Sequence, residues 1–297
     1  MPAQLLEGGP LATQLRAEIA RDVRVLKDQG RNVCLATVLV GDKHESVLYV
    51  KSQKKVAAEL GIDFRLEQLP GATTQPGLMQ AIDALNRDAT VHGIVLQLPL
   101  PARLDARLAQ RAIEPKKDAE GIHPSNLGLI LFGVTQRAPC TAIAAYQLIK
   151  SLGADLYGKE AVVVGHSQIV GKPIGQLLLH DFCTVTTCHI ATRDLAAHTR
   201  RADLLVVAVG KAGRITKDMV KPGAIVIDIG VNRVPLTDDK GQPVLDEKGN
   251  PKSKLVGDVD FEGVREVASV LTPVPGGVGP LTVTMLMRNV VESAKQA

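Results

Sequence analysis

The first half of the chain alternates between two spacings of apolar residues. Residues 11–29 carry apolar side chains at steps of three and four, which predicts an amphipathic helix. The apolar run 33–41 ends in glycine and suits a strand covered on both faces, as in a parallel sheet. The alternation continues, and we expect helices at 44–60, 75–88, 103–112 and 140–152 and strands at 62–68 and from 93. Strands and helices at this spacing indicate right-handed βαβ units.

A second series of the same kind begins after residues 153–155. Its expected strands, with helical segments between them, are 161–165, 183–189, 203–210 and 224–230. Residues 235–256 are polar and rich in turn-forming residues, which indicates an exposed hairpin or insertion. A final helix is expected from about residue 280. The predicted fold class is therefore α/β with two domains, and the first boundary lies near 145–153.

Composition and charge narrow the classes of function. The 297 residues are 45% hydrophobic and 22% charged, as in a soluble globular protein of one large or two ordinary domains. Lys and Arg are not gathered in a stripe, the net charge is only +4 and aromatic residues make up 2%, which gives no support to nucleic-acid binding. The N-terminal region has no signal-peptide pattern, and no apolar run approaches the length of a membrane span. We expect a cytoplasmic protein that binds neither nucleic acid nor membrane.

Cysteine and histidine spacings predict no metal site. The four cysteines form no C-x-x-C and no Cys/His cluster. The seven histidines do not combine with Cys, Asp or Glu at ligand spacing. We therefore expect reduced thiols, which agrees with a cytoplasmic location.

A strand–turn–helix motif at residues 162–173 carries the first chemical signal. Gly165 would let the backbone turn sharply, and Gly171 would let the following helix approach both a pyrophosphate and the sheet. The N-terminus of that helix offers unpaired N–H groups to an anion. The motif G-x-S-x-x-x-G differs from the usual G-x-G-x-x-G, and a βα turn can also need two glycines for packing alone. The regular strands that follow favour dinucleotide binding.

The end of the next strand bears on the choice of dinucleotide. An acidic residue about 20 positions beyond the glycine turn normally binds the ribose of NAD, and the segment 188–193 contains none. Arg193 could pair with the 2′-phosphate of NADP, or it could be a solvated loop cation. Both interpretations of Arg193 are open at this point.

Five short segments together resemble one enzyme family. They are Thr272–Thr282 (TPVPGGVGPLT), Val95–Pro101 (VLQLPLP), Ser46-x-x-Tyr49-Val50, Pro139-Cys140-Thr141 and Gly257-Asp258-Val259. In order and spacing they are similar to the methylenetetrahydrofolate dehydrogenase/cyclohydrolase family, and the resemblance covers nearly the whole chain. The run TPVPGGVGP is highly specific, since composition gives no reason for it.

The resemblance implies a domain arrangement and a reaction. A three-layer α/β catalytic domain, residues 1–148 plus 273–297, contains the C-terminal helix, and residues 149–272 form a Rossmann-type NAD(P)-binding domain. Members are usually homodimers that bind folate in a cleft between the domains. They oxidise 5,10-methylenetetrahydrofolate to the methenyl cation, usually with NADP, in the one-carbon metabolism that serves purine biosynthesis. Most then hydrolyse the cation to 10-formyltetrahydrofolate in the same site.

Tyr49 and Gln53 share one face of the helix after the first strand. Tyr49 matches the family's active-site tyrosine, which stacks near the folate; the other interpretation is a half-buried core tyrosine. Gln53 stands where the family has a lysine, and glutamine cannot relay a proton. Hydride transfer needs positioning more than proton movement, whereas hydrolysis needs an activated water. We therefore predict that dehydrogenase activity is retained and that cyclohydrolase activity is weak or absent.

Three further polar residues are candidates for the folate site. Gln97 ends a predicted strand, where α/β sheets place ligands, and matches the family's cleft glutamine. Asp118 and Glu120 lie in Lys-Asp-Ala-Glu-Gly, where the family typically has Lys-Asp-Val-Asp-Gly. Glu120 takes the place of the aspartate that contacts the pterin, although both acids could instead cap the next turn. The resemblance assigns Tyr49, Gln53, Gln97 and Asp118 to catalysis.

The resemblance also assigns binding residues. Cofactor contacts are expected from Gly165, His166, Ser167, Ile169, Gly171, Pro173, Ile190, Arg193, Gly210 and Val231. Substrate contacts are expected from Tyr49, Gln97, Glu120, Pro273, Gly276 and Gly277. The last two glycines could also serve only a tight loop. His166 and Ile190 stand where members that prefer NADP commonly have Arg and Ser, so NADP is the family default and NAD is possible.

Two other functions fit the same residues. One is a dehydrogenase of the same fold that acts on another small molecule, which TPVPGGVGP and QLPLP disfavour. The other is a folate- or dinucleotide-binding protein without catalysis, which the departures at Gln53, Glu120, His166 and Ile190 keep open. An assay of methylenetetrahydrofolate oxidation with each cofactor distinguishes these two functions from the family's dehydrogenase activity.

Overall fold

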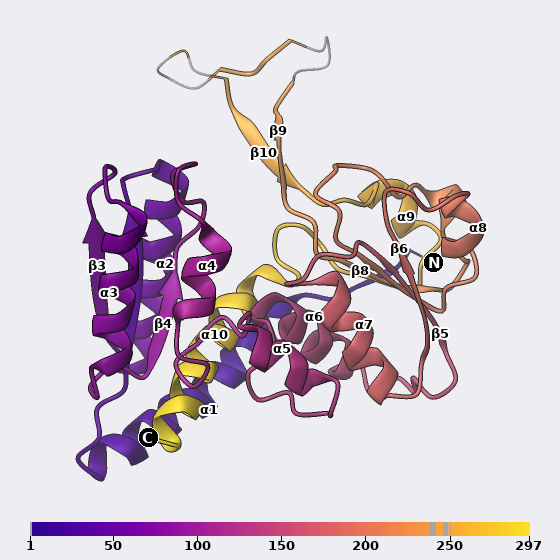
Figure 1. The fold of residues 1–297 in the computed structure, drawn as a ribbon. Helices are drawn as coiled ribbons and strands as arrows, with labels where there is room; N and C mark the ends of the chain where they lie inside the picture. Colours follow the sequence, from indigo (N-terminus) through magenta and orange to yellow (C-terminus); the bar gives the residue numbers. More distant parts are fainter. Residues whose placement is uncertain (1, 238–241, 246–248, 250) are drawn as a thin grey trace. The chain divides into compact units, whose positions relative to one another are not determined.

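The computed structural model describes residues 2–237, 242–245, 249 and 251–297. The chain forms two compact units. The six-stranded unit contains the residues up to Leu11 together with Ala144–Pro280, and the three-stranded unit contains Ala12–Ile143 together with Leu281–Ala297. Figure 1 shows the elements of each unit.

A parallel sheet with the order β3-β2-β4 organises the three-stranded unit. Its strands are β2 (Cys34–Val40), β3 (Asp63–Leu69) and β4 (Gly93–Leu96). Its helices, three of which extend across the unit boundaries, are α1 (Gly8–Asp28), α2 (His44–Leu60), α3 (Gln75–Arg87), α4 (Ala106–Ala112), α5 (Pro124–Ile130), α6 (Cys140–Lys150) and α10 (Gly279–Lys295). Helices α3 and α4 share a buried apolar cluster with β2 and β4. Helix α10 packs closely on β4: a Cβ added at Gly93 would lie only 2.7 Å from the side chain of Val290. The expected return of the C-terminal helix to this unit is therefore confirmed.

Helix α2 begins and ends at the residues that the sequence predicts. Gly61 ends it with φ of 75°, a left-handed conformation that favours glycine, and its N–H donates to the Ala58 carbonyl. The buried face of α2 includes Ser46 and Gln53. The helix thus directs polar side chains toward the interior of the unit, next to the sheet.

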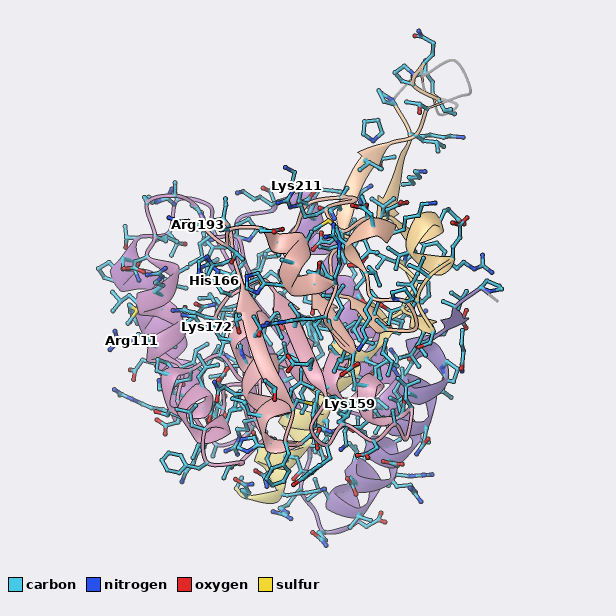
Figure 2. All side chains as sticks on the ribbon, turned by 90° about the vertical axis from the view of Figure 1, so that its right-hand side faces the viewer. Arg111, Lys159, His166, Lys172, Arg193 and Lys211 are labelled. Atoms are coloured by element: carbon cyan, nitrogen blue, oxygen red, sulfur yellow. The ribbon has the colours of Figure 1, made fainter. Side chains whose placement is uncertain are left out.

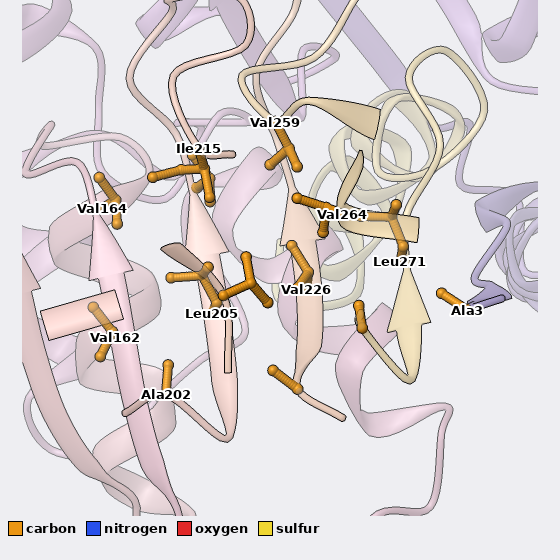
Figure 3. Packing of buried hydrophobic residues seen from close by; sticks show 14 of the residues in the cluster. Ala3, Val162, Val164, Ala202, Leu205, Ile215, Val226, Val259, Val264 and Leu271 are labelled. Atoms are coloured by element: carbon orange, nitrogen blue, oxygen red, sulfur yellow. The ribbon is translucent and has the colours of Figure 1, made fainter. Parts of the chain in front are cut away.

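The six-stranded unit contains a sheet with the order β1-β11-β8-β7-β5-β6, and its strand pairs are parallel. The strands are β1 (Gln4–Leu5), β5 (Glu160–Val164), β6 (Thr184–Cys188), β7 (Leu204–Val207), β8 (Ile225–Asp228) and β11 (Val270–Leu271). The helical segments are α7 (Gly171–His180), α8 (Leu195–Thr199), α9 (Phe261–Arg265) and the 3₁₀ turn η1 (Lys217–Met219). Aliphatic side chains of β5, β7 and β8 pack with α9 and β11 in one buried cluster (Figure 3).

The strand order reverses beside β5. Strand β6 pairs on one side of β5 and β7 on the other. The connection from β5 to β6 therefore runs toward one edge of the sheet, and the connection from β7 to β8 runs toward the other edge. In α/β sheets, ligands bind outside the carboxyl ends of the strands at such a point. The loop that follows Val164 and the loop that follows Val207 both begin there.

The first eleven residues lie in a different unit from the one expected. Strand β1 pairs in parallel with β11, and the backbone N–H of Ala3 donates to the Arg265 carbonyl at 2.8 Å. A two-residue strand is too short to carry a periodic signal, so its sequence gave no indication of this pairing.

The polar segment after β8 begins and ends as a hairpin. Strands β9 (Asn232–Pro235) and β10 (Ser253–Val256) pair antiparallel, which confirms the hairpin for these residues. The predicted segment also includes 238–241, 246–248 and 250, which lie outside the described residues. Among the helices of the described chain, none combines the length and apolar character needed to cross a membrane.

Candidate active site

Helix α2 holds two of the expected catalytic residues. Gln53 is fully buried, and its side-chain oxygen accepts a hydrogen bond from the Thr37 hydroxyl at 2.9 Å. Its amide nitrogen is buried without a hydrogen-bond partner among the residues that the structure describes. A buried donor in this state costs about 1–3 kcal/mol unless a ligand or water accepts from it. Tyr49 is 36% exposed and presents part of its ring to the surface of the unit.

Gln97 lies at the carboxyl end of β4, as expected. Its amide nitrogen donates to the carbonyl oxygen of Leu98 at 2.9 Å, and its buried side-chain oxygen accepts no hydrogen bond from any described residue. The Ser46 hydroxyl on α2 donates to the same Leu98 carbonyl at 3.2 Å. The start of α2 and the loop after β4 are thereby joined. Gln53 then offers an unpaired donor and Gln97 an unpaired acceptor within one unit.

Asp118 is buried and organises the loop that follows it. Its carboxylate accepts hydrogen bonds from the backbone N–H groups of Gly121 at 3.1 Å and His123 at 2.8 Å, and from the Asn126 amide at 2.8 Å. These three donors satisfy the carboxylate, so the capping interpretation suits Asp118. Gly121 has φ of 73°, and a Cβ there would collide with the Ala138 carbonyl. We regard Asp118 as a positioning residue.

The Glu120 carboxyl differs from Asp118 because it makes no hydrogen bond within the described part of the chain. Burial, followed by the nearby charge of Asp118, raises the pKa of Glu120 to about 8. The side chain is therefore mainly protonated at pH 7. It keeps both a donor and an acceptor for a ligand.

Helix α10 fixes the backbone beside Glu120. Asn289 donates from its side-chain nitrogen to the Ala119 carbonyl at 3.0 Å, and the Cys140 thiol donates to the same carbonyl at 3.3 Å. The Cys140 N–H donates to the Glu120 carbonyl at 3.1 Å. Asn289 was not among the site residues expected from the sequence. Its only local signal is a polar side chain on the largely apolar buried face of α10, which Thr284 and Ser293 also carry.

Tyr49 lies near Gln53, Glu120 and Cys140. Burial, then the proximity of Cys140 and Glu120, raises the pKa of the Tyr49 hydroxyl above its usual range, and the Gln53 side chain acts in the opposite direction. Tyr49 is therefore neutral at physiological pH. The three-stranded unit thus brings Tyr49, Gln53, Glu120 and Cys140 into one cluster.

The loop after β5 has the shape of a dinucleotide turn. Gly165 has φ of 127°, and a Cβ there would collide with the Ala208 carbonyl. A Cβ at Gly171 would collide with the backbone of Gly165. The Ser167 hydroxyl accepts from the N–H groups of Val170 at 3.2 Å and Gly171 at 3.4 Å, which orders the entry into α7. At Gly165 and Gly171 the backbone therefore passes so close to neighbouring backbone that only glycine fits. The start of α7 lies at the strand-order reversal, which is where a pyrophosphate binds in this class of sheet.

Two histidines meet at the ends of β5 and β6. The rings of His166 and His189 have their centroids 5.2 Å apart. Ile190 is completely exposed, and Arg193 is exposed without a hydrogen bond or ion pair to any described residue. Figure 2 shows His166 and Arg193 at the same end of the sheet. Because His166 and Arg193 are exposed, their side chains can approach a phosphate on the ribose of a dinucleotide.

The other expected cofactor residues occupy two kinds of position. Ile169, Gly210 and Val231 are exposed in the loops after β5, β7 and β8. Pro173 is buried in the first turn of α7 and shapes the helix rather than offering a surface. The three exposed residues lie at the carboxyl ends of their strands, where a dinucleotide binds in this class of sheet.

The segment after β11 is a tight loop in the six-stranded unit. Gly276 has φ of 115°. The N–H of Gly277 donates to the Pro273 carbonyl at 2.8 Å, and a Cβ on Gly277 would lie 2.9 Å from the Cβ of Thr272. The glycines are therefore required by the loop itself, which is also compatible with the expected ligand contacts.

No group of three His, Cys, Asp or Glu residues able to hold a metal ion occurs in the described part of the chain.

Both units match one protein family over most of their length. Residues 6–120 match the tetrahydrofolate dehydrogenase/cyclohydrolase catalytic domain, and residues 139–297 match the NAD(P)-binding domain of the same family. A relative from Polaromonas sp., named bifunctional protein FolD, is 47% identical over 296 residues, and the match covers 100% of each chain.

Solved structures agree with this match. The bifunctional methylenetetrahydrofolate dehydrogenase/cyclohydrolase from Campylobacter jejuni has a TM-score of 0.90 and 43% identity over 99% of both chains. The Trypanosoma brucei enzyme, solved with NADP and an inhibitor, has a TM-score of 0.90 and 36% identity over 100% of this chain and 98% of its own. The resemblance seen in the sequence motifs is confirmed, and the chain belongs to the tetrahydrofolate dehydrogenase/cyclohydrolase family of NAD(P)-dependent enzymes.

Proposed function

We propose that this enzyme oxidises 5,10-methylenetetrahydrofolate to 5,10-methenyltetrahydrofolate rapidly and hydrolyses the product slowly. The observation that carries the proposal is the fully buried amide side chain of Gln53, which lies against Thr37 and Tyr49. It stands where the family resemblance places a lysine, beside Tyr49 and in the same unit as Gln97 and Glu120. The site keeps its binding groups but has exchanged its ionisable nitrogen for a neutral amide.

Hydride transfer needs little from a proton-carrying group. The C–H bond of the methylene carbon breaks, and its electron pair leaves with the hydrogen. When bound, NAD(P) supplies the carbon that accepts this hydride. Positive charge then develops on the folate, where the face of the neutral Tyr49 ring and the unpaired oxygen of Gln97 are suited to stabilise it.

Hydrolysis of the methenyl cation has a different requirement. A water must lose a proton as it attacks the cation, and a group of suitable pKa must carry that proton away. An amide cannot do this at neutral pH. Gln53 can hold a water or a folate oxygen by its N–H, so it supports binding and not proton transfer.

Replacing Gln53 by lysine tests this division. Gln53→Lys is expected to raise the methenyltetrahydrofolate hydrolysis rate about tenfold or more relative to the dehydrogenase rate, because general catalysis typically contributes about 10²–10⁴-fold. Gln80→Lys is the matched control, since it adds the same charge at an exposed position on α3. A wild-type hydrolysis rate comparable to its dehydrogenase rate would refute the proposal. Absence of dehydrogenase activity with either cofactor would favour the non-catalytic binding protein.

We also propose that NADP is used and that NAD is accepted to a substantial degree. Arg193 and His166 supply cationic or ionisable groups for a 2′-phosphate, whereas Ile190 supplies no donor side chain. Comparing kcat/KM for the two cofactors tests this, and an NADP preference above about a hundredfold, or about 2.7 kcal/mol, would contradict it.

We further propose a cytoplasmic homodimer. The dimer rests on the family resemblance, and the location is supported by four cysteines that are all unpaired, three of them buried. Light scattering on the purified protein measures the assembly, and a monomeric mass at micromolar concentration would contradict the dimer.

A further inference from the structure

A buried carboxylate closes the loop after β7. Asp258, which is fully buried, accepts hydrogen bonds from four donors. The backbone N–H groups of Val209 and Gly210 donate to Oδ2 at 2.6 and 2.9 Å. The N–H of Lys211 and the side-chain amide of Asn232 donate to Oδ1, both at 2.8 Å. Three consecutive backbone N–H groups therefore converge on one side chain.

Asp258 is itself held in place by a second buried carboxylate. Asp228, the last residue of β8, accepts from the N–H groups of Asp258 at 3.0 Å and Val259 at 2.9 Å. A Cβ at Gly257 would collide with the Asp228 carboxylate, and a Cβ at Gly230 would collide with that of Asp258. The sequence Gly257-Asp258-Val259, which the folate and cofactor contacts do not use, is thus explained by this pair of acids.

The same pair reaches the loop after β11. The Thr272 hydroxyl accepts from the N–H of Asp228 at 2.7 Å and donates to its carbonyl oxygen at 3.2 Å. Thr272 directly precedes the tight loop that includes Gly277. The ends of β7, β8 and β11 and the base of the β9–β10 hairpin are therefore connected through Asp228 and Asp258.

We propose that Asp258 is a positioning residue for the dinucleotide: by binding the N–H groups of residues 209–211, it fixes the loop after β7 in the shape that receives the cofactor. This loop flanks the strand-order reversal beside β5, where the glycine turn also lies. Left free, three convergent N–H groups would attract an anion. Because Asp258 occupies them, the loop has one conformation before the cofactor binds, and its exposed edge at Gly210 is preorganised. The inference rests on the proposed cofactor contact at Gly210.

Asp258→Asn is the direct test, because the substitution keeps the side-chain volume and replaces one oxygen by a donor. Whichever way the amide is turned, its nitrogen faces two of the four donors. We expect the dissociation constant for NADPH, measured by fluorescence titration, and the KM for NAD(P) to rise at least tenfold. The kcat at saturating cofactor is expected to change less than threefold.

Two controls separate positioning from loss of stability. Asp260→Asn changes an exposed cap of α9 two residues away, and Asn is an equally good cap. Val264→Ala opens a cavity in the core of the same unit and lowers Tm, while the hydrogen bonds from residues 209–211 to Asp258 do not involve Val264. If Val264→Ala raises the NADPH dissociation constant as much as Asp258→Asn does, or if Asp258→Asn stays within twofold of the wild type, the proposal is overturned.

A milder variant decides the matter if Asp258→Asn does not fold. Asn232→Ala removes one of the donors to Oδ1 and leaves residues 209–211 paired, so the NADPH dissociation constant is expected to rise two- to fivefold. No change in that variant would overturn the proposal. Because titration with NADPH needs no folate, these outcomes are independent of whether the wild type oxidises methylenetetrahydrofolate, which tests the proposed function separately.

Discussion

Replacing Glu120 by glutamine should make the protein more stable at alkaline pH. Burial and the neighbouring Asp118 raise the pKa of Glu120 from 4.5 to about 8. Between these values the carboxyl is ionised in the unfolded chain and protonated in the folded one. Folding then takes up a proton, so the free energy of unfolding falls as the pH rises from 4.5 to 8. Glutamine does not titrate, and Glu120→Gln loses this dependence.

The size of the stability change follows from the difference between the two pKa values of Glu120, 4.5 and about 8. At about 1.4 kcal/mol for each pH unit, the full loss is about 5 kcal/mol at pH 8. Glu120 keeps some contact with solvent, which screens part of the effect, and we expect about half, or 2–3 kcal/mol. For a chain of this size the corresponding rise in Tm of the variant over the wild type is about 4–10 °C at pH 8. The difference should approach zero near pH 4.5.

Thermal and urea unfolding of both proteins from pH 5 to pH 8.5 measure this difference. Glu114→Gln is the matched control, because Glu114 is exposed in the same loop and the substitution removes the same charge. Equal pH slopes for the wild type and Glu120→Gln would refute the reasoning. They would mean that Glu120 ionises in the folded protein as readily as in the unfolded chain.

Two substitutions in the six-stranded unit give further tests. Gly165→Ala should lower Tm and raise the KM for NAD(P) at least tenfold, because its Cβ would collide with the Ala208 carbonyl; Gly213→Ala, which has φ of 62° but open space around it, should lower only Tm. Kinetic assays and thermal melts of both variants test this, and equal KM values for NAD(P) in the two variants would contradict it. His166→Arg should shift the ratio of kcat/KM values toward NADP about tenfold or more, since a guanidinium can form two parallel charge-assisted hydrogen bonds with a phosphate. An unchanged ratio would place the 2′-phosphate away from the loop after β5.

The local parts of the fold were predictable from the sequence. Helix α2 occupies the predicted residues 44–60, because an apolar face and a terminating Gly61 both lie within a short window. The glycine turn at 165–171 was recognisable for the same reason: the strand, the turn and the helix are contiguous. Short-range patterns determine these elements, and no knowledge of distant contacts is needed.

The contacts that complete the site were not predictable in this way. Asn289 bonds the Ala119 carbonyl across a separation of 170 positions, and Asp258 bonds Lys211 across 47. Locally, Asn289 resembles the other polar residues of α10, and Asp258 resembles an exposed acid in a loop. The raised pKa of Glu120 likewise depends on burial, which only the folded unit creates. Motif resemblance named Asp258 without indicating what it does.

The division of the chain into its units has a consequence for synthesis on the ribosome. Residues 12–143 emerge before residues 144–280 of the six-stranded unit, but their own unit also needs residues 281–297, which are made last. Until α10 arrives, the apolar surface of β4 beside Gly93 stays uncovered, and the Ala119 carbonyl lacks the Asn289 donor. The three-stranded unit is therefore incomplete until translation of the six-stranded unit has ended. A nascent chain halted before residue 281 would expose an unfinished core to chaperones and proteases.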